Sequence, residues 1–224
     1  MRSGAALRAL AFAAVAGLSC VALDPHDSAR SIPLAGGVVH ESAAAPSMDP
    51  RKLDALVSRV APELDDALRA RLVVALMSES SRNGYDPIFL AALVGVESRW
   101  HTGAESARGA RGLLQLKPST FAWISAREPD VGGEDLETGD DPVVDVRLAI
   151  RYFNWLERSF SSRDAALMAY NAGPRRMRQH LRAGDIPERL HAYPQKVRHE
   201  YERLLRIEEQ SEHELGGVLL ARVP

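Results

Sequence analysis

Hydrophobic residues along most of the chain recur at intervals of three and four, the spacing of one face of an α-helix. Asp-Pro pairs mark three helix starts, because aspartate caps a first turn and proline fits its first position. No segment alternates as a half-buried strand does, and no internal repeat is present. The pattern predicts helices that begin at Asp49-Pro50, Asp86-Pro87 and Asp141-Pro142, and further helices over residues 64–83, 118–126, 164–169, 175–183 and 195–212.

These helices predict an all-α fold in a single compact domain from about residue 49 to residue 212. The chain has 224 residues, 46% of them hydrophobic, which is enough for one core. Residues 21–48 are rich in Ala, Ser, Pro and Gly without a period, so we expect a flexible linker there. Residues 213–224 are predicted to be a loose C-terminal tail.

The first twenty residues are typical of a secretory signal peptide. Two arginines precede an apolar run over residues 9–18, which is too short to cross a bilayer as a mature helix. Cys20 is the only cysteine and lies two residues after the end of the run, which suggests lipidation of an outer-membrane lipoprotein, although Gly17 departs from the usual lipobox. Ordinary cleavage is the alternative. Either route predicts an exported, periplasmic protein, with membrane attachment through Cys20 in the first case.

Glu97 is the candidate for chemistry. It ends an apolar helix, where the macrodipole and unpaired carbonyls disfavour a charged carboxylate. If Leu93, Val96 and Trp100 exclude water, desolvation acts in the same direction, and a protonated carboxyl can serve as a general acid. A glutamate in this position is more often a solvated surface residue. A glycine-rich loop follows and allows close approach to a ligand.

Two motifs stand out from the rest of the sequence. The first, ESRWHTGAESARGARGLLQLKPST, covers residues 97–120, and the second, AYNAGP, covers residues 169–174. Together they resemble the signatures of the soluble lytic transglycosylase (SLT) catalytic domain. The likeness extends over roughly residues 86–206. It implies a goose-lysozyme-like fold with a substrate groove, acting on bacterial peptidoglycan. Thr102, Leu114 and Asp145 depart from the residues common in the family.

By this resemblance, Glu97 is the single catalytic acid and base. It would cleave the bond between N-acetylmuramic acid and N-acetylglucosamine, while the muramyl C6 hydroxyl closes a 1,6-anhydro ring. No metal or organic cofactor is implied. The third family element is only loosely kept, because Arg189 and Pro194 replace expected residues around Tyr193. The implied substrate-binding residues are Ser98, Ser106, Gln115, Tyr170, Asn171 and Tyr193.

Two other functions fit the same sequence. A goose-type lysozyme would hydrolyse the bond and would need Asp130, Asp135 or Asp145 to activate water. A non-catalytic peptidoglycan-binding protein would need no acid at all. Nucleic acid is disfavoured by export and by the net charge of −2, and the seven histidines show no metal-ligand spacing. The arginines over residues 175–182 either attract substrate carboxylates or form a solvated helix face.

Overall fold

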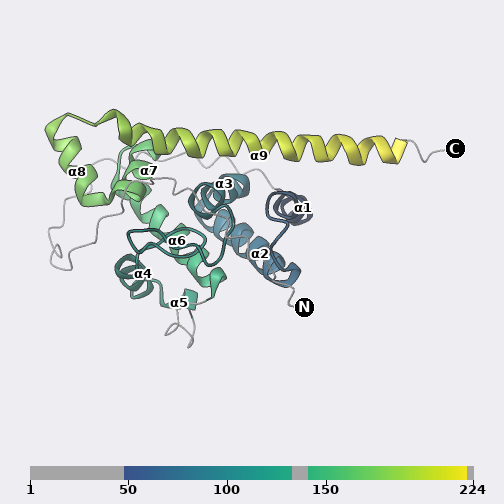
Figure 1. The fold of residues 1–224 in the computed structure, drawn as a ribbon, viewed down its shortest axis with the longest axis horizontal. Helices are drawn as coiled ribbons and strands as arrows, with labels where there is room; N and C mark the ends of the chain where they lie inside the picture. Colours follow the sequence, from purple (N-terminus) through teal and green to yellow (C-terminus); the bar gives the residue numbers. More distant parts are fainter. Residues whose placement is uncertain (1–47, 133–140, 221–224) are drawn as a thin grey trace, which may run out of the picture.

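The computed structural model describes residues 48–132 and 141–220, and in these ranges the chain is helical with no strand (Figure 1). Two isolated β-bridges are present, both in the loop after Glu97. The helices are α1 (Pro50–Val60), α2 (Asp66–Asn83), α3 (Pro87–Ser98), α4 (Pro118–Ser125), α5 (Pro129–Gly132), α6 (Pro142–Ser159), α7 (Arg163–Ala172), α8 (Pro174–Ala183) and α9 (Glu188–Leu220).

The three predicted Asp-Pro helix starts are confirmed. The side chains of Asp49, Asp86 and Asp141 each accept a hydrogen bond from the backbone N–H two residues later, at 2.8, 2.8 and 2.9 Å. Each bond satisfies a donor that the first helical turn leaves unpaired. α1, α3 and α6 therefore begin where local sequence dictates.

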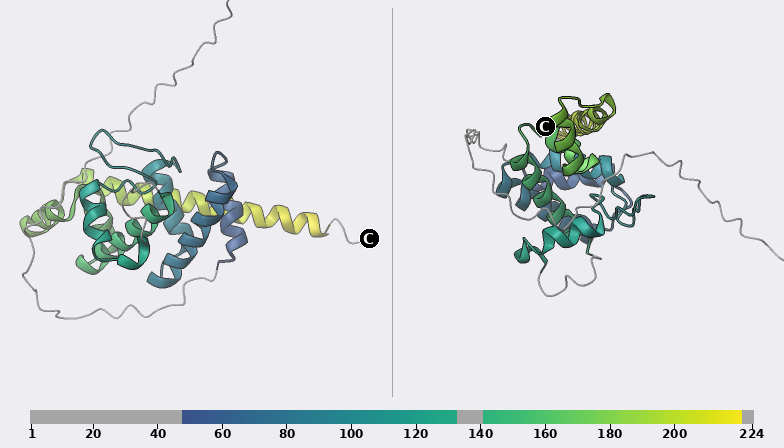
Figure 2. Two further views of the ribbon diagram at one scale, coloured as in Figure 1. Left: turned by 90° about the horizontal axis from the view of Figure 1, so that it is seen from below. Right: turned by 90° about the vertical axis from the view of Figure 1, so that its left-hand side faces the viewer.

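α3 is the central helix of the fold. Every residue from Pro87 to Val94 is buried, so neighbours cover all of its sides. α9 packs on α3 and α7, while α2 packs on α6 and α1. α9 runs along one side of the molecule, and its C-terminal part extends past α1, as Figure 1 and the left view of Figure 2 show. The burial of α3 fixes the position of its C-terminal end, where Glu97 lies.

The predicted limits of the last helix were wrong at both ends. α9 begins at Glu188 instead of Gln195, and it continues to Leu220 instead of ending at Glu212. Pro194 lies inside it, in its second turn, where it removes one backbone donor. Leu190, Tyr193 and Val197 are all buried on the same face across this proline, and their packing maintains the helix.

Three sequence predictions lie outside the described residues. They are the signal peptide with Cys20, nearly all of the linker over residues 21–48, and most of the acidic loop over residues 131–140. None of the helices within the described ranges combines the length and apolarity needed to cross a membrane.

Candidate active site

Glu97 lies in the last turn of α3, just before a sharp change in chain direction. The next residues include two non-glycine positions with left-handed backbone, Arg99 (φ 52°) and Trp100 (φ 67°). This conformation costs about 1 kcal/mol for each such residue. The Trp100 side chain is buried in the core, and its packing holds the turn in place. The glutamate is thus presented at a rigid helix end.

The carboxyl of Glu97 is partly buried, and this environment changes its acidity. Loss of hydration raises its pKa to about 7, against the opposing effects of a hydrogen bond from Tyr193 and the positive charge of Lys196. Near neutral pH the group is therefore present in both protonated and ionised forms. A carboxyl with this property can donate a proton and later accept one.

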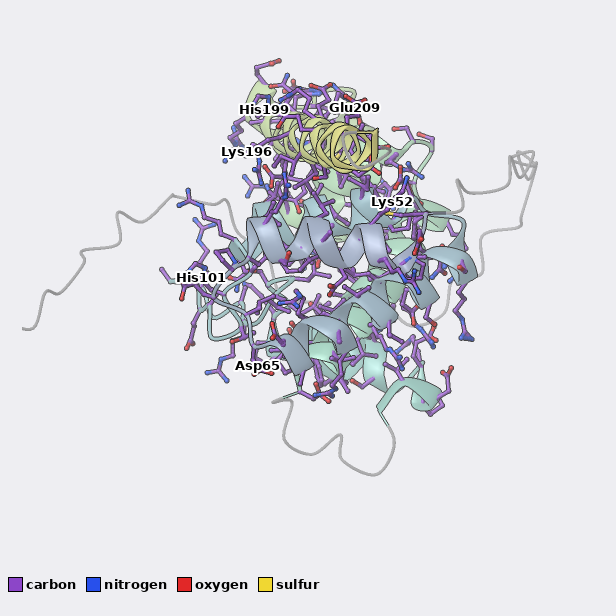
Figure 3. The ribbon with its side chains drawn as sticks, turned by 90° about the vertical axis from the view of Figure 1, so that its right-hand side faces the viewer. Lys52, Asp65, His101, Lys196, His199 and Glu209 are labelled. Carbon is purple, nitrogen blue, oxygen red and sulfur yellow. The ribbon has the colours of Figure 1, made fainter. Side chains whose placement is uncertain are left out.

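α9 supplies the group that contacts Glu97. The hydroxyl of Tyr193 donates a hydrogen bond to Oε1 of Glu97. Lys196 lies one turn further along α9, and Figure 3 shows its side chain on the same side of the molecule as His101, which belongs to the loop after Glu97. Tyr193 was the weakest candidate from sequence, because its flanking residues depart from the family pattern. The structure brings it to the candidate acid.

Gln115 and Ser106 hold the loop that follows Glu97. The Gln115 amide nitrogen donates to the carbonyl oxygens of Ala104 (3.0 Å) and Gly112 (2.9 Å). The Ser106 hydroxyl accepts from the backbone N–H of Ala110 at 3.0 Å. Both side chains were predicted to bind substrate. In this structure the hydrogen bonds of both side chains go to the loop's own backbone, so they shape the loop that follows Glu97.

Tyr170 supports the same loop through a hydrogen bond to its backbone. Its hydroxyl donates to the carbonyl oxygen of Leu114 at 2.7 Å. Its ring is only 4% exposed and packs against Tyr152 and Phe153. Tyr170 was predicted to bind substrate, but core aromatic residues cover its ring. Tyr170 instead fixes the position of Leu114.

The two remaining predicted residues differ in accessibility. Ser98 is buried, and its hydroxyl donates to the carbonyl oxygen of Val94 at 3.3 Å, within its own helix. Asn171 lies at the end of α7 and is partly exposed. Its amide makes no hydrogen bond to another described residue, so it is available to a ligand.

Asp145 was weighed from sequence only as a second carboxylate, and its actual position was missed. It is 7% exposed and lies against Gly112, where an added Cβ would be 2.2 Å from Asp145 Oδ2. Gly112 has φ +77°, a left-handed backbone conformation that favours glycine. The side chain of Asp145 also leaves no room for a Cβ atom at this position. Burial raises the pKa of Asp145 to about 6, while backbone groups of Leu114 and Leu113 oppose the rise. Its departure from the residue common in the family at this position was the one signal of its role in the sequence.

The other carboxylates considered for water activation are placed differently. Asp130 accepts hydrogen bonds from Arg151, the nearer at 2.9 Å, and lies 3.5 Å from Arg82. These contacts, chiefly the bond to Arg151, lower its pKa. Asp135 lies outside the described residues. Asp130 therefore belongs to a network of ion pairs that connects α2, α5 and α6.

Comparison with known proteins identifies the family. Residues 75–189, just over half of the chain, match the transglycosylase SLT domain. The chain belongs to this family, as the two motifs indicated, and the predicted all-α, lysozyme-like fold is confirmed.

Two solved structures are similar. The 70 kDa soluble lytic transglycosylase SLT70 from Escherichia coli is 23% identical, with a TM-score of 0.51, and the match covers 70% of this chain and 28% of that one. An inactive mutant of the lytic transglycosylase Slt from Pseudomonas aeruginosa is 23% identical, with a TM-score of 0.49, covering 74% and 38%. This chain thus spans well under half the length of either protein.

Proposed function

We propose that this protein is a lytic transglycosylase that cleaves peptidoglycan glycan strands, with Glu97 as its single acid and base. The observation that carries the proposal is the partly buried carboxyl of Glu97, whose pKa is about 7 and which accepts a hydrogen bond from Tyr193. Membership of the SLT family supplies the substrate class. The available amide of Asn171 suits the N-acetyl and hydroxyl groups of a sugar.

The reaction balances with one protein group. Protonated Glu97 gives its proton to the glycosidic oxygen as the bond from that oxygen to muramyl C1 breaks. The C6 hydroxyl of the same muramyl residue then forms a bond to C1, and its proton passes to ionised Glu97. The enzyme returns to its starting state, and no water is consumed. The attacking hydroxyl is already part of the substrate, which raises its effective concentration.

The positions of Asp145 and Asp130 support this reaction over hydrolysis. A hydrolase with the same acid needs a second carboxylate that can hold water near C1. Asp145 is buried beneath Gly112, and Asp130 is paired with Arg151. Neither of these two is therefore arranged as a base for water.

The proposal is tested by mass spectrometry of sacculi digested with the purified protein. We expect products that end in 1,6-anhydromuramic acid, and reducing-end muramic acid would instead show a lysozyme. Glu97→Gln keeps the shape of the side chain and removes the proton, so turnover should fall by several orders of magnitude while sacculus binding persists. Glu105→Gln makes the same chemical change at an exposed position of the loop and serves as the control. Equal turnover by Glu97→Gln and wild type would exclude Glu97 as the acid.

A further inference from the structure

Gly95 is a glycine inside α3 that the backbone itself does not require. It lies two residues before Glu97, in the helical part of the chain, and it has no positive φ. Alanine is the better helix former at such a position, because glycine loses more backbone freedom on folding. The reason for a glycine here therefore lies in what packs against it.

The side chain of Glu200 on α9 occupies the space beside Gly95. A Cβ atom added at Gly95 would lie 2.6 Å from Oε1 of Glu200 and 3.3 Å from its Cδ and Cγ. Arg203 holds the carboxylate with two hydrogen bonds, from Nε to Oε2 at 2.8 Å and from Nη2 to Oε1 at 2.7 Å. Rotation of the carboxylate alone would break these bonds and leave the Cγ contact in place. A side chain at position 95 would therefore press on α9.

The same two helices form the hydrogen bond to the candidate acid. α9 packs on α3, and the hydroxyl of Tyr193 on α9 donates to Oε1 of Glu97 on α3. Tyr193 and Glu200 are two helical turns apart, so they lie on one face of α9. A helix moves as a stiff unit over two turns. A displacement of α9 at Glu200 is consequently carried to Tyr193.

The position of α9 also sets the charge environment of Glu97. The two side chains that lower the pKa of Glu97 are Tyr193, through its hydrogen bond, and Lys196, through its charge, and both belong to α9. His101, in the loop after Glu97, directs its Nδ1 to the carbonyl oxygens of the two residues that follow Glu97, at 3.0 and 3.1 Å. The approach of α9 is thus the feature that brings polar groups to the acid.

We propose that Gly95 is a positioning residue, whose missing side chain lets α9 come close enough to α3 for the Tyr193 hydroxyl to reach Glu97. This inference rests on the proposed function, in which Glu97 is the acid and base. Gly95 acts only through α9. Even a methyl group at position 95 separates the two helices at Glu200 and weakens the Tyr193 hydrogen bond, because such a bond depends steeply on distance and angle.

The test measures the pKa of Glu97 by NMR titration of protein labelled with 13C at the glutamate carboxyl groups. The signal that is missing from Glu97→Gln identifies the residue. In otherwise wild-type protein, Tyr193→Phe should raise this pKa by about 0.5 to 1, the change that corresponds to one ordinary hydrogen bond. In Gly95→Ala protein, the same substitution should raise it by less than about half as much, because the bond is already weakened.

Two further variants separate the contact with Glu200 from other effects. Gly103→Ala makes the same chemical change in the loop after Glu97, where nothing lies within 4 Å, and should keep the full effect of Tyr193→Phe. Gly95→Ala/Glu200→Ala removes the side chain that the new methyl group meets and should restore the full effect. A merely structural role of Gly95 would change the stability of the protein and leave the effect of Tyr193→Phe intact.

Three outcomes would overturn the inference: a full effect of Tyr193→Phe in Gly95→Ala, no effect in wild type, or no restoration by Glu200→Ala. If Gly95→Ala fails to fold, a folded Gly95→Ala/Glu200→Ala with the full effect would support the contact, and misfolding of both would overturn it. The titration needs no substrate, whereas the proposed reaction is judged by its anhydro products. Failure of one is therefore distinguishable from failure of the other.

Discussion

The hydroxyl of Tyr193 on α9 donates a hydrogen bond to Oε1 of Glu97 on α3, across 96 positions of sequence. A hydrogen bond to a carboxylate stabilises its ionised form and therefore lowers its pKa. Burial has the opposite and larger effect, and the balance leaves the pKa of Glu97 at about 7. The distance between α3 and α9 at this point thus controls how much of the acid is protonated at neutral pH.

Tyr193→Phe should shift the pH dependence of activity upward. Without the donor, the pKa of Glu97 rises above about 7, and the decline of kcat/KM at alkaline pH moves with it, because the first step needs a protonated acid. Release of anhydro product measured between pH 5 and pH 9 would show the shift. Tyr201→Phe is the matched control, since the Tyr201 hydroxyl donates to Asp86 on the same pair of helices. A decline at the same pH in Tyr193→Phe and wild type would contradict the prediction.

Lys196→Met should act in the same direction as Tyr193→Phe and by a smaller amount. The ammonium of Lys196 favours the ionised form of Glu97 through its charge, an effect that ranks below the Tyr193 hydrogen bond. Lys196 is exposed, so added salt should reduce the difference between the variant and wild type. Lys196→Arg keeps the charge and should restore the wild-type profile. A larger shift in Lys196→Met than in Tyr193→Phe would contradict this order, in which the Tyr193 hydrogen bond lowers the pKa of Glu97 more than the charge of Lys196 does.

Local sequence predicted the helices and the candidate acid because their causes are local. The caps at Asp49, Asp86 and Asp141 depend on a side chain and a backbone N–H two residues away. Glu97 was found from its place after an apolar helix and before a glycine-rich loop. Both kinds of signal lie within a few residues of the group concerned.

Features that depend on packing between distant segments were missed. The proximity of Asp145 to Gly112 requires α6 to lie under the loop, which no pattern near either residue reveals. The burial of Tyr170 likewise follows from the neighbouring aromatic residues of α6. Pro194 indicated a helix boundary by its usual local effect, and the buried face of α9 outweighed it.

Gly112→Ala should destabilise the fold more than Gly109→Ala. Both glycines are left-handed, at φ +77° and +73°, so each substitution carries a backbone cost of about 1 kcal/mol. At Gly112 the new Cβ would also lie 2.2 Å from Asp145 Oδ2, whereas nothing lies within 4 Å at Gly109. We expect at least about 2 kcal/mol of lost unfolding free energy at Gly112, measured by urea denaturation. Equal losses at the two sites would refute the steric argument.

Adding Asp145→Ala to Gly112→Ala tests the contact itself. Asp145→Ala removes the oxygen that the new methyl group would meet, so the double variant should be more stable than the sum of the two single effects predicts. Strict additivity would mean that the strain at Gly112 arises from its backbone alone.

Asp145→Asn should stabilise the protein at neutral pH. The pKa of Asp145 is raised from 3.8 to about 6 by burial, so between these values the folded state holds a proton that the unfolded state has lost. The unfolding free energy therefore falls as pH rises from about 4 to 6, by up to about 3 kcal/mol. Asparagine keeps the shape beneath Gly112 and has no charge to bury.

The advantage of Asp145→Asn over wild type should consequently be largest at pH 7 and disappear toward pH 4, as measured by urea denaturation across that range. Asp185→Asn removes the same charge from an exposed position between α8 and α9 and is the control. If Asp145→Asn were less stable than wild type at pH 7, the carboxylate would gain more from the N–H groups of Leu113 and Leu114 than burial costs it. In that case the ionised carboxylate of Asp145 would hold the loop in place.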